Sequence, residues 1–368
     1  MKKSQEKKKR KPVDHVLLAV LFTLVCMGLM MVFSASAPSA FEEFGDSLHY
    51  FKRQLAWVIM GFFVLAFVSV VNYKSYKNTL PILLVINLVL LVLVATVGTN
   101  VKGAQRWLGI GSFGIQPSEL TKVVVVVYMA SYLTKLQTQK QTIATVYVPP
   151  LIMVGIPLVL IILQPHFSAI MIIGVVCAAM MIVGGVKFRF FAPAFVAAGI
   201  GGTALAILEP YRLQRLVAFS DPFADKLGDG WQIVQSLYAI GSGGLTGLGL
   251  SRSRQKHLYI PEPQNDFIYS ILCEELGYIG AVFVIILFVL LVWRCFVVAA
   301  RCPDPFGSLL AFGMGFLIIF QVIFNIGVAT ASVPPTGVPL PFFSAGGSSF
   351  LFQMIAMGIV LNVSRSAQ

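Results

Sequence analysis

Charged residues are scarce in this chain. Of its 368 residues only 11% are charged, whereas 57% are hydrophobic, and the mean hydropathy is +0.85. A soluble domain of this length has too little interior to bury so much apolar surface. The shortage of charge therefore excludes a soluble globular protein and indicates a polytopic membrane protein.

Cysteines are also few, and their positions exclude two further classes. The five are Cys26, Cys177, Cys273, Cys295 and Cys302. Each falls in an apolar run or in the loop near residue 300, and none has metal-ligand spacing with a histidine. This distribution argues against a disulfide framework and against a cysteine-histidine metal site.

Acidic residues are missing from most of the apolar runs. Only Glu119, Glu274 and Glu275 lie within such runs, and Asp266 lies at the edge of one. An ion-coupled transporter usually needs charged or broken-helix sites near the bilayer midplane. The polar residues gather instead in the segments between the runs, so the sequence disfavours such a transporter.

The apolar runs predict an all-α fold of about ten transmembrane helices, because a bilayer demands about 20 apolar residues for each span. The expected spans are 14–35, 54–72, 79–98, 117–134, 146–164, 167–185, 189–208, 266–293, 306–330 and 346–363. We expect a basic tail at 1–13 and a single membrane domain at 14–368. A large outer loop at 209–265 separates the seventh and eighth spans.

Lys and Arg residues predict the orientation. With the N terminus in the cytoplasm, the inner segments hold sixteen of them, seven in the tail, against four in the short outer loops. The large loop adds six on the outer side, but long loops translocate largely regardless of charge. Both termini are therefore predicted to be cytoplasmic. The tail is expected to lie at an anionic membrane surface rather than on nucleic acid.

Asp266 is the first candidate for a reactive group. It follows the stiff Pro261-Glu262-Pro263 segment and comes just before an apolar run. A carboxylate at the bilayer centre costs about 2.5–3.5 kcal/mol on insertion scales, so one kept beside a span indicates a use for it. The alternative is that Asp266 caps the N terminus of the helix that follows.

A second candidate is the motif QPSELTK at 116–122. Pro117 suits the first turn of a helix, where Glu119 meets the positive end of the helix dipole. Lys122 lies three residues further on and faces the same side. The two charges form either a local ion pair at a helix start or a base and a cation at the mouth of a cavity.

Two further outer segments are rich in turn-forming residues. Glycines at 241, 243, 244, 247 and 249 allow backbone to approach a ligand closely, or serve only turns and close helix contacts. No GK[ST] follows, so a P-loop is not indicated. The segment 334–349 contains four prolines and three glycines and cannot continue a helix. It must pack within protein or line a cavity.

Together these motifs resemble the SEDS family of bacterial membrane proteins (shape, elongation, division and sporulation), especially its FtsW/SpoVE branch. The resemblance covers nearly the whole chain. It is carried by VFSAS at 32–36, KRQLAW at 52–57, GAQRW at 103–107, QPSELTK at 116–122, YRLQRL at 211–216, WQIVQSLYAIGSGG at 231–244, SRQK at 253–256, PEPQNDFI at 261–268, EELG at 274–277 and PTGVPLPFFSAGGSS at 335–349.

The resemblance implies a peptidoglycan glycosyltransferase that polymerises lipid II at the outer face of the bacterial cytoplasmic membrane, during division or sporulation. It implies that Asp266 is essential and that Glu119 and Lys122 line the same outer cavity. The partners that it implies are a class B penicillin-binding protein and other division proteins, at the septum. The matched motifs supply further candidate substrate-binding residues: Arg106, Arg212, Arg215, Gln235, Lys256, Glu262, Ser344 and Ser348.

The implied reaction has clear chemical needs. A general base must take the proton of the attacking sugar hydroxyl, and cations must stabilise the departing pyrophosphate. Asp266 is the candidate base, and Lys122, Arg212 and Arg215 are candidate cations. Mg²⁺ or Mn²⁺ held by Asp266 is an alternative, and no organic cofactor is expected. Glu274 and Glu275 are expected to brace the cavity floor or to meet backbone polar groups.

The chain also departs from the family pattern. His166 stands where the family usually has Asp, Ala329-Thr-Ala331 replaces the usual VTG, Ala345 replaces a Tyr, and Asp225-Lys226 replaces an Asp-Pro pair. These changes bear on the shape of the cavity or on a partner surface. None touches Asp266, Glu119 or Lys122, so activity is the expectation.

Two other classes of function compete with the glycosyltransferase. A lipid II flippase would need a polar path through the bilayer, which the few intramembrane charges disfavour. An inactive scaffold that recruits cell-wall enzymes would have no need of Asp266.

Overall fold

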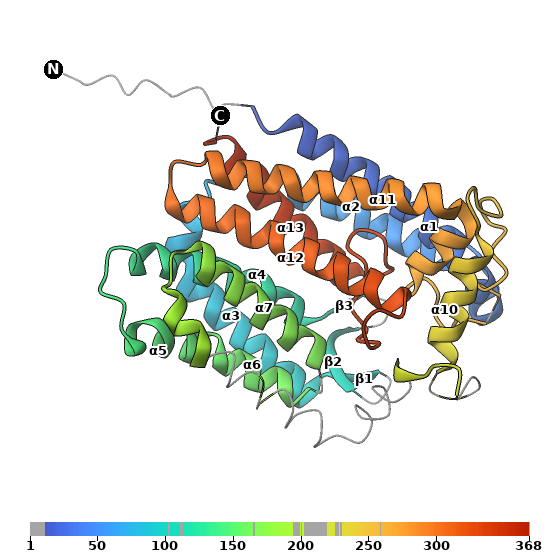
Figure 1. The fold of residues 1–368 in the computed structure, drawn as a ribbon, viewed down its shortest axis with the longest axis horizontal. Helices are drawn as coiled ribbons and strands as arrows, with labels where there is room; N and C mark the ends of the chain where they lie inside the picture. The colour runs from blue at the N-terminus through green and yellow to red at the C-terminus, as the bar shows by residue number, and fades with distance from the viewer. Residues whose placement is uncertain are drawn as a thin grey trace.

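The chain folds mostly into helices that run along one long axis (Figure 1). The computed structural model describes residues 12–101, 104–110, 113–164, 166–193, 199, 201, 219–224, 228, 230–257 and 259–367. The all-α prediction is confirmed for the body of the protein. The tail at 1–13 lies almost entirely outside the described residues, so its role stays a prediction.

Six described helices are long and apolar enough to cross a membrane. They are α1 (His15–Phe44), α2 (His49–Val70), α3 (Ser75–Val97), α11 (Ile268–Arg301), α12 (Pro305–Ala329) and α13 (Gly347–Ser364). Two shorter apolar helices, α5 (Ile143–Met153) and α6 (Gly155–Ile162), are bent by 43° relative to each other. Counted together as one broken span, they raise the number of spans among the described residues to seven. The chain is therefore a multi-pass membrane protein.

The remaining helices of the bundle also follow the expected spans. α4 (Pro117–Leu136) and α7 (Phe167–Val183) begin at or near the expected residues, and a short 3₁₀ turn, η1 (Phe188–Phe190), follows. Every expected span coincides with a described helix or with the bent pair, except 189–208, which lies largely outside the described residues. The number of ten spans stays a prediction.

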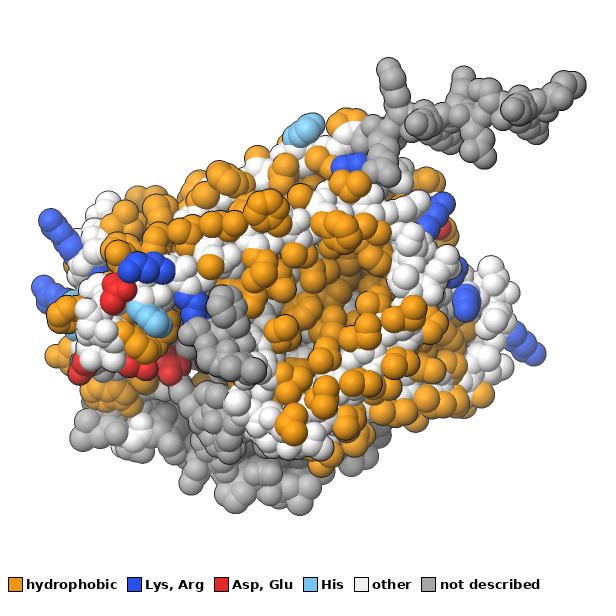
Figure 2. All heavy atoms as spheres, turned by 180° about the vertical axis from the view of Figure 1, so that it is seen from behind, with side chains coloured by type: hydrophobic (Ala, Val, Ile, Leu, Met, Phe, Trp, Pro, Cys, Tyr) orange, Lys and Arg blue, Asp and Glu red, His pale blue; other side chains and the backbone are white. Residues whose placement is uncertain are grey.

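One broad face of the bundle is apolar (Figure 2). Phe63 and Phe67 on α2 are 74% and 71% exposed, and Val97 at the end of α3 is 69% exposed. Charged side chains gather at the two ends, and most of the acidic ones visible on this face lie at one of them. An apolar band between two polar ends is the surface that a bilayer requires.

Helix α13 lies at the centre of the bundle and packs against α2, α12 and α4. Most of its side chains are buried. Gly358 allows this close packing, because a Cβ there would lie 3.0 Å from Val68 and 3.1 Å from the backbone oxygen of Leu65 on α2. Small residues at such contacts let membrane helices approach closely.

The two ends of the described chain meet at one end of the bundle (Figure 1). The backbone N–H of Asp14 donates to Ser364 Oγ at 3.1 Å. The Asp14 carboxylate accepts from the backbone N–H of Leu17 and from Arg294 on α11. Asp14 and Ser364 thus lie at the same end of the bundle, while the placement of the termini in the cytoplasm stays a prediction.

A small antiparallel sheet joins α3 to α4, an element that the sequence analysis did not predict. Its strands are β1 (Thr99–Val101), β2 (Ala104–Ile110) and β3 (Phe113–Ile115), in the order β1-β2-β3. Gln105 pairs with Asn100, and Gly109 pairs with Gly114. β1 and β3 have only three residues each, and the seven residues of β2, AQRWLGI, do not alternate between apolar and polar, which is why the sequence pattern does not reveal them.

Candidate functional site

Asp266 lies two residues before the first residue of α11. Helix α11 begins at the end of the bundle opposite the labelled N and C ends of the chain (Figure 1). The N-cap of α11 is Phe267 rather than Asp266, and the Phe267 side chain makes no capping hydrogen bond. The interpretation of Asp266 as the helix cap is therefore wrong. Its carboxylate is partly buried at the start of the helix.

The proline-rich segment 334–349 covers the backbone around Asp266. Asn325 Nδ2, on α12, donates to the backbone oxygens of Asp266 and Val338, each at 2.8 Å. The Ser344 hydroxyl donates to the backbone oxygen of Asn265 at 2.7 Å. Gln264 O accepts from the Ala345 N–H at 2.8 Å. The expectation that this segment packs within protein is confirmed.

Gly337 brings this segment close to the Asp266 carboxylate. Its φ of +70° lies in the left-handed region that favours glycine. A Cβ placed there would lie 3.5 Å from Asp266 Oδ2. Because only a hydrogen projects from this position, the backbone can pass beside the carboxylate without a side chain covering it.

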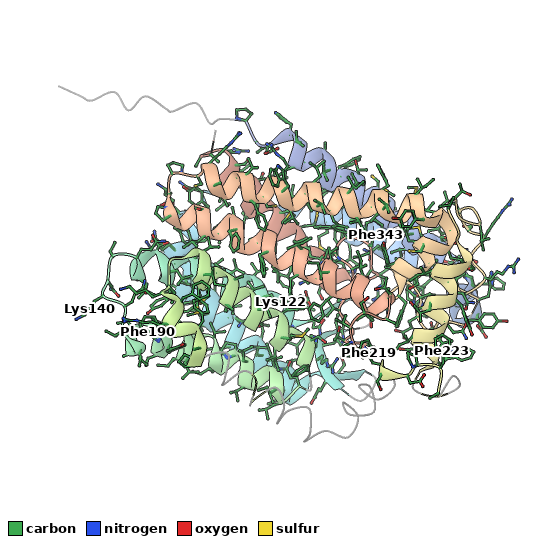
Figure 3. All side chains as sticks on the ribbon, viewed as in Figure 1. Lys122, Lys140, Phe190, Phe219, Phe223 and Phe343 are labelled. Atoms are coloured by element: carbon green, nitrogen blue, oxygen red, sulfur yellow. The ribbon has the colours of Figure 1, made fainter. Side chains whose placement is uncertain are left out.

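Glu119 and Lys122 form a buried ion pair on the first turns of α4. Lys122 Nζ lies 2.7 Å from Glu119 Oε1, and the two side chains are 3% and 5% exposed. Pro117 occupies the first turn of the helix, as predicted. Figure 3 shows Lys122 within the body of the bundle. Removing water from two charges costs free energy that their pairing must offset, so each charge depends on the other.

His166 joins the starts of α4 and α7. Its Nδ1 lies 3.0 Å from Ser118 Oγ. Burial, and then the nearby cations of Arg106 and Lys122, lower the pKa of His166 to about 3, so the ring is neutral at physiological pH. Arg106, on β2, donates from Nε to the backbone oxygen of Gln164 at 3.1 Å.

Two contacts connect these helix starts to the segment over Asp266. The Ser168 hydroxyl, on α7, donates to the backbone oxygen of Thr336. The Gln116 N–H, before α4, donates to Ser348 Oγ at 3.3 Å. The segment 334–349 therefore contacts the backbone at Asp266 on one side and the starts of α4 and α7 on the other. Ser344 and Ser348, both predicted substrate-binding residues, make structural hydrogen bonds here.

Glu274 and Glu275 hold the preceding loop, as expected. The Glu274 carboxylate accepts from the Ser253 hydroxyl and from the backbone N–H groups of Arg254 and Gln255. Glu275 Oε1 lies 2.9 Å from Lys256 Nζ, with both side chains buried. Lys256, a predicted substrate-binding residue, thus lies in an ion pair that favours a bracing role.

The glycine-rich run pairs with α11 through its backbone. The N–H groups of Leu248 and Gly249 donate to the backbone oxygens of Glu274 and Glu275 at 2.9 and 3.0 Å. A Cβ on Gly247 would lie 2.2 Å from the Glu275 oxygen. Gly277, with a φ of 66°, breaks the helix at this contact. The run therefore serves close helix contact, the second of its two interpretations.

The remaining predicted substrate-binding residues are Arg212, Arg215, Gln235 and Glu262. Arg212 and Arg215 lie outside the described residues. Gln235 is buried on α10 (Trp231–Ser242), which packs against α11. Glu262 is exposed, and its carboxylate accepts from Asn265 Nδ2 at 2.8 Å. The predicted outer loop 209–265 is described only in part.

A cavity of about 160 Å³ lies beside the Asp266 loop, and the sequence analysis missed it. It is lined by Tyr50, Arg53, Gln54, Trp57, Trp107, Gly114, Glu262, Gln264, Asn265, Ala345, Gly346 and Gly347. The motifs KRQLAW and GAQRW both carry an arginine and a tryptophan. The tryptophans of these motifs, Trp57 and Trp107, line the cavity and are the signal that could have identified it.

The described residues do not include a group of three or more His, Cys, Asp or Glu side chains that could hold a metal ion. Mg²⁺ often binds through one or two carboxylates together with substrate phosphates. Asp266 fits that kind of site only with the substrate present. A metal at Asp266 therefore stays a prediction.

The structure describes three of the four departures from the family pattern. His166 is the neutral ring that links α4 to α7. The backbone oxygen of Ala329 accepts from Ser236 Oγ at 2.6 Å, and Ala331 has a φ of 52°. Ala345 lines the cavity. Asp225 and Lys226 lie outside the described residues.

Fold and site define a polytopic helical membrane protein that gathers buried charges and a carboxylate at one end of its bundle. The family model for cell cycle proteins of the FtsW, RodA and SpoVE type matches residues 14–368. The chain belongs to this family, the SEDS family, in its FtsW/SpoVE branch.

Curated relatives resemble the chain over almost its whole length. Stage V sporulation protein E of Bacillus subtilis is 40% identical over 97% of this chain and 98% of its own. A probable peptidoglycan glycosyltransferase FtsW of Coxiella burnetii is 37% identical over 95% of this chain and 96% of its own.

Solved structures share the fold. A chain of a peptidoglycan synthase complex that coordinates polymerization and crosslinking has a TM-score of 0.80 and 28% identity, over 96% of this chain and 98% of that chain. The rod shape determining protein RodA of Thermus thermophilus has a TM-score of 0.71 and 25% identity, over 96% and 97%.

Proposed function

We propose that this chain is a peptidoglycan glycosyltransferase that polymerises lipid II into glycan strands at the outer face of the cytoplasmic membrane, during division or sporulation. Curated relatives at 37% identity are named probable peptidoglycan glycosyltransferases. The single observation that carries the proposal is the position of Asp266. Its carboxylate lies at a helix start, at the end of the bundle away from the termini, beneath the segment 334–349.

In the proposed reaction, a hydroxyl of one saccharide attacks the anomeric carbon of another. A new carbon–oxygen bond forms, the bond to the pyrophosphate breaks, and the pyrophosphate leaves with the electron pair. Asp266 accepts the hydroxyl proton as general base. The base must lie at the membrane surface, because the lipid tail of the substrate stays in the bilayer.

The leaving pyrophosphate needs positive charge nearby. Lys122 is a candidate, although its ammonium group is paired with the Glu119 carboxylate. In the proposed complex, a phosphate oxygen of the substrate would also bind this ammonium group. Arg106 lies close enough to lower the pKa of His166 and adds a second cation to the same region. Arg212 and Arg215 are further proposed phosphate ligands.

A divalent cation, Mg²⁺ or Mn²⁺, is part of the proposal. Asp266 would be its protein ligand and the substrate phosphates would complete its coordination. Such an ion would supply charge stabilisation for the leaving group. With or without it, Asn325 and the segment 334–349 fix the backbone from which the Asp266 side chain projects.

The proposed partner is a class B penicillin-binding protein, which would cross-link the strands, together with other division proteins at the septum. A related fold occurs in a peptidoglycan synthase complex that coordinates polymerization and crosslinking. We propose that both termini are cytoplasmic, because the basic tail suits the inner leaflet.

The proposed function is tested with purified protein in liposomes that contain labelled lipid II, with the transpeptidase and Mn²⁺ or Mg²⁺. Glycan strands are separated on a gel, and transfer of lipid II between leaflets is measured in the same vesicles. Strands without transfer support the polymerase. Transfer without strands would identify a flippase instead, and neither product would identify a scaffold.

A further inference from the structure

The cavity beside the Asp266 loop has no role in the reaction as described so far. It is lined by two indole rings, Trp57 and Trp107, and by two side chains of opposite charge, Arg53 and Glu262. These residues come from α2, from β2 and from the loop that leads to Asp266. Four segments far apart in the sequence thus meet here, with Ala345–Gly347 as the fourth.

Gln264 is one of the residues that line this cavity. It is 2% exposed, and its buried Oε1 has no hydrogen-bond partner among the described residues. Its backbone oxygen is already bonded to the Ala345 N–H at 2.8 Å. Buried polar atoms are almost always paired, so an unpaired acceptor in a residue that lines a cavity points to a ligand that donates to it.

Each of the two indole rings packs closely against a glycine. A Cβ on Gly347 would lie 2.1 Å from the Trp57 ring, and a Cβ on Gly114 would lie 3.1 Å from the Trp107 ring. The glycines therefore leave space for the rings to lie against the backbone. Fixed aromatic surfaces lose little conformational entropy when a ligand binds.

The chemistry of the wall selects the class of ligand. Indole rings pair an apolar face with a polar edge, which suits the C–H face and the hydroxyl edge of a sugar ring. An amide oxygen accepts from a hydroxyl or an N–H. Arg53 and Glu262 together bring no net charge, and as donor and acceptor they suit the hydroxyl groups of a neutral sugar. Its volume of about 160 Å³ has room for one sugar ring.

We infer that this cavity is a saccharide subsite that holds one sugar ring of the glycan strand. The inference rests on the proposed function and adds to it a place where the strand is held. Gln264 and Asn265 directly precede Asp266 in the chain, so the bound ring lies next to the reacting end. Strand held there between additions stays on the enzyme, and the polymer grows longer.

Binding is measured by tryptophan fluorescence of the full-length protein in detergent, with the tetramer of β-1,4-linked N-acetylglucosamine as probe. The chain has four tryptophans, and two of them line the cavity. We expect saturable quenching of the fluorescence. Trp293→Phe is the control, because Trp293 is 63% exposed near the far end of α11 and should leave the quenching unchanged.

Three variants test the cavity itself. Gln264→Leu removes the free acceptor but keeps the backbone bond to Ala345, and should weaken probe binding about tenfold. Ala345→Tyr should fill the cavity and abolish the quenching. Trp107→Phe should remove part of the signal. Thermal unfolding of each variant shows whether it is folded. If Ala345→Tyr is not folded, the binding result for Gln264→Leu alone tests the inference.

Two results would overturn the inference. The first is quenching that persists unchanged in Gln264→Leu and Ala345→Tyr. The second is quenching by inorganic pyrophosphate and not by the saccharide, which would make the cavity an anion subsite. The assay needs no catalysis and is repeated with Asp266→Asn. Strand synthesis without probe binding defeats this inference alone, and probe binding without strand synthesis defeats the proposed function alone.

Strand length gives a second readout. Gln264→Leu and Ala345→Tyr should shorten the mean strand several-fold on a gel, whereas Trp293→Phe should leave strand length unchanged. Strands of unchanged length from both variants would show that the cavity does not hold the polymer.

Discussion

Asn325 Nδ2 lies 2.8 Å from the backbone oxygen of Asp266 and bonds the backbone oxygen of Val338 at the same distance. One buried amide on α12 therefore joins the start of α11 to the segment 334–349. Both bonds are to backbone, so the position of Asp266 depends on Asn325 whatever its own carboxylate does. This makes Asn325 a positioning residue for the proposed base.

We predict that Asn325→Ala lowers the rate of strand synthesis at least tenfold and destabilises the fold by about 1–3 kcal/mol, because two buried oxygens lose their donor. Lipid II binding should be unchanged, so the loss falls on kcat rather than KM. Gln321→Ala, one turn earlier on α12 and equally buried, is the matched control. A similar loss of rate in both variants would contradict the assignment.

Because the Glu119–Lys122 pair is buried, the stability of the protein should depend strongly on keeping both charges together. Lys122→Met or Glu119→Gln alone should destabilise the protein by about 3–5 kcal/mol, because each leaves an uncompensated buried charge. The double variant should recover most of the melting temperature without recovering activity. Lys52→Ala, which breaks the exposed pair with Asp46, should leave the melting temperature unchanged. A single variant as stable as the wild type would contradict the account.

Lys256 allows the bracing and substrate-binding roles to be separated. Lys256→Met should destabilise the protein by about 3–5 kcal/mol, because Glu275 loses its buried partner. Adding Glu275→Gln should restore stability and leave the KM for lipid II near the wild-type value. A double variant that is stable but has a KM raised tenfold would assign Lys256 to the substrate instead.

His166 predicts a pH dependence of stability with a definite sign. Its pKa falls from an ordinary 6.5 to about 3 in the folded protein, because burial and two cations disfavour the charged ring. Folding therefore releases a proton below pH 6.5. Stability should be full above that pH and should decrease toward pH 3 by up to about 1.4 kcal/mol per unit. In His166→Gln this decrease of stability toward low pH should be absent, as melting temperatures from pH 4 to 8 would show. Parallel curves for the two proteins would contradict it.

Local patterns predicted much of the architecture. Run lengths placed α1, α2, α3 and α13, and the Pro117-x-Glu119 pattern placed the start of α4 with its ion pair. These features depend on residues within a few positions of one another. Bilayer thickness fixes span length independently of any partner, which is why hydropathy performs well here.

Features that depend on distant contacts were not predictable from one sequence. Trp57 and Trp107 are fifty residues apart and meet only through the sheet between α3 and α4. The pairing of Gly247 with the Glu275 backbone likewise requires the fold. A glycine run alone is equally consistent with a ligand-binding loop, so only the structure shows that this run serves close contact with a helix.

The most direct test of the central claim is the initial rate of lipid II polymerisation by Asp266→Asn in liposomes, beside wild type and Asp46→Asn. The latter makes the same substitution at an exposed carboxylate between α1 and α2. Because a positioned general base contributes about 10²–10⁴-fold, the Asp266 variant should be at least about a hundredfold slower, with its melting temperature and lipid II binding retained. Wild-type rates from Asp266→Asn would contradict the account.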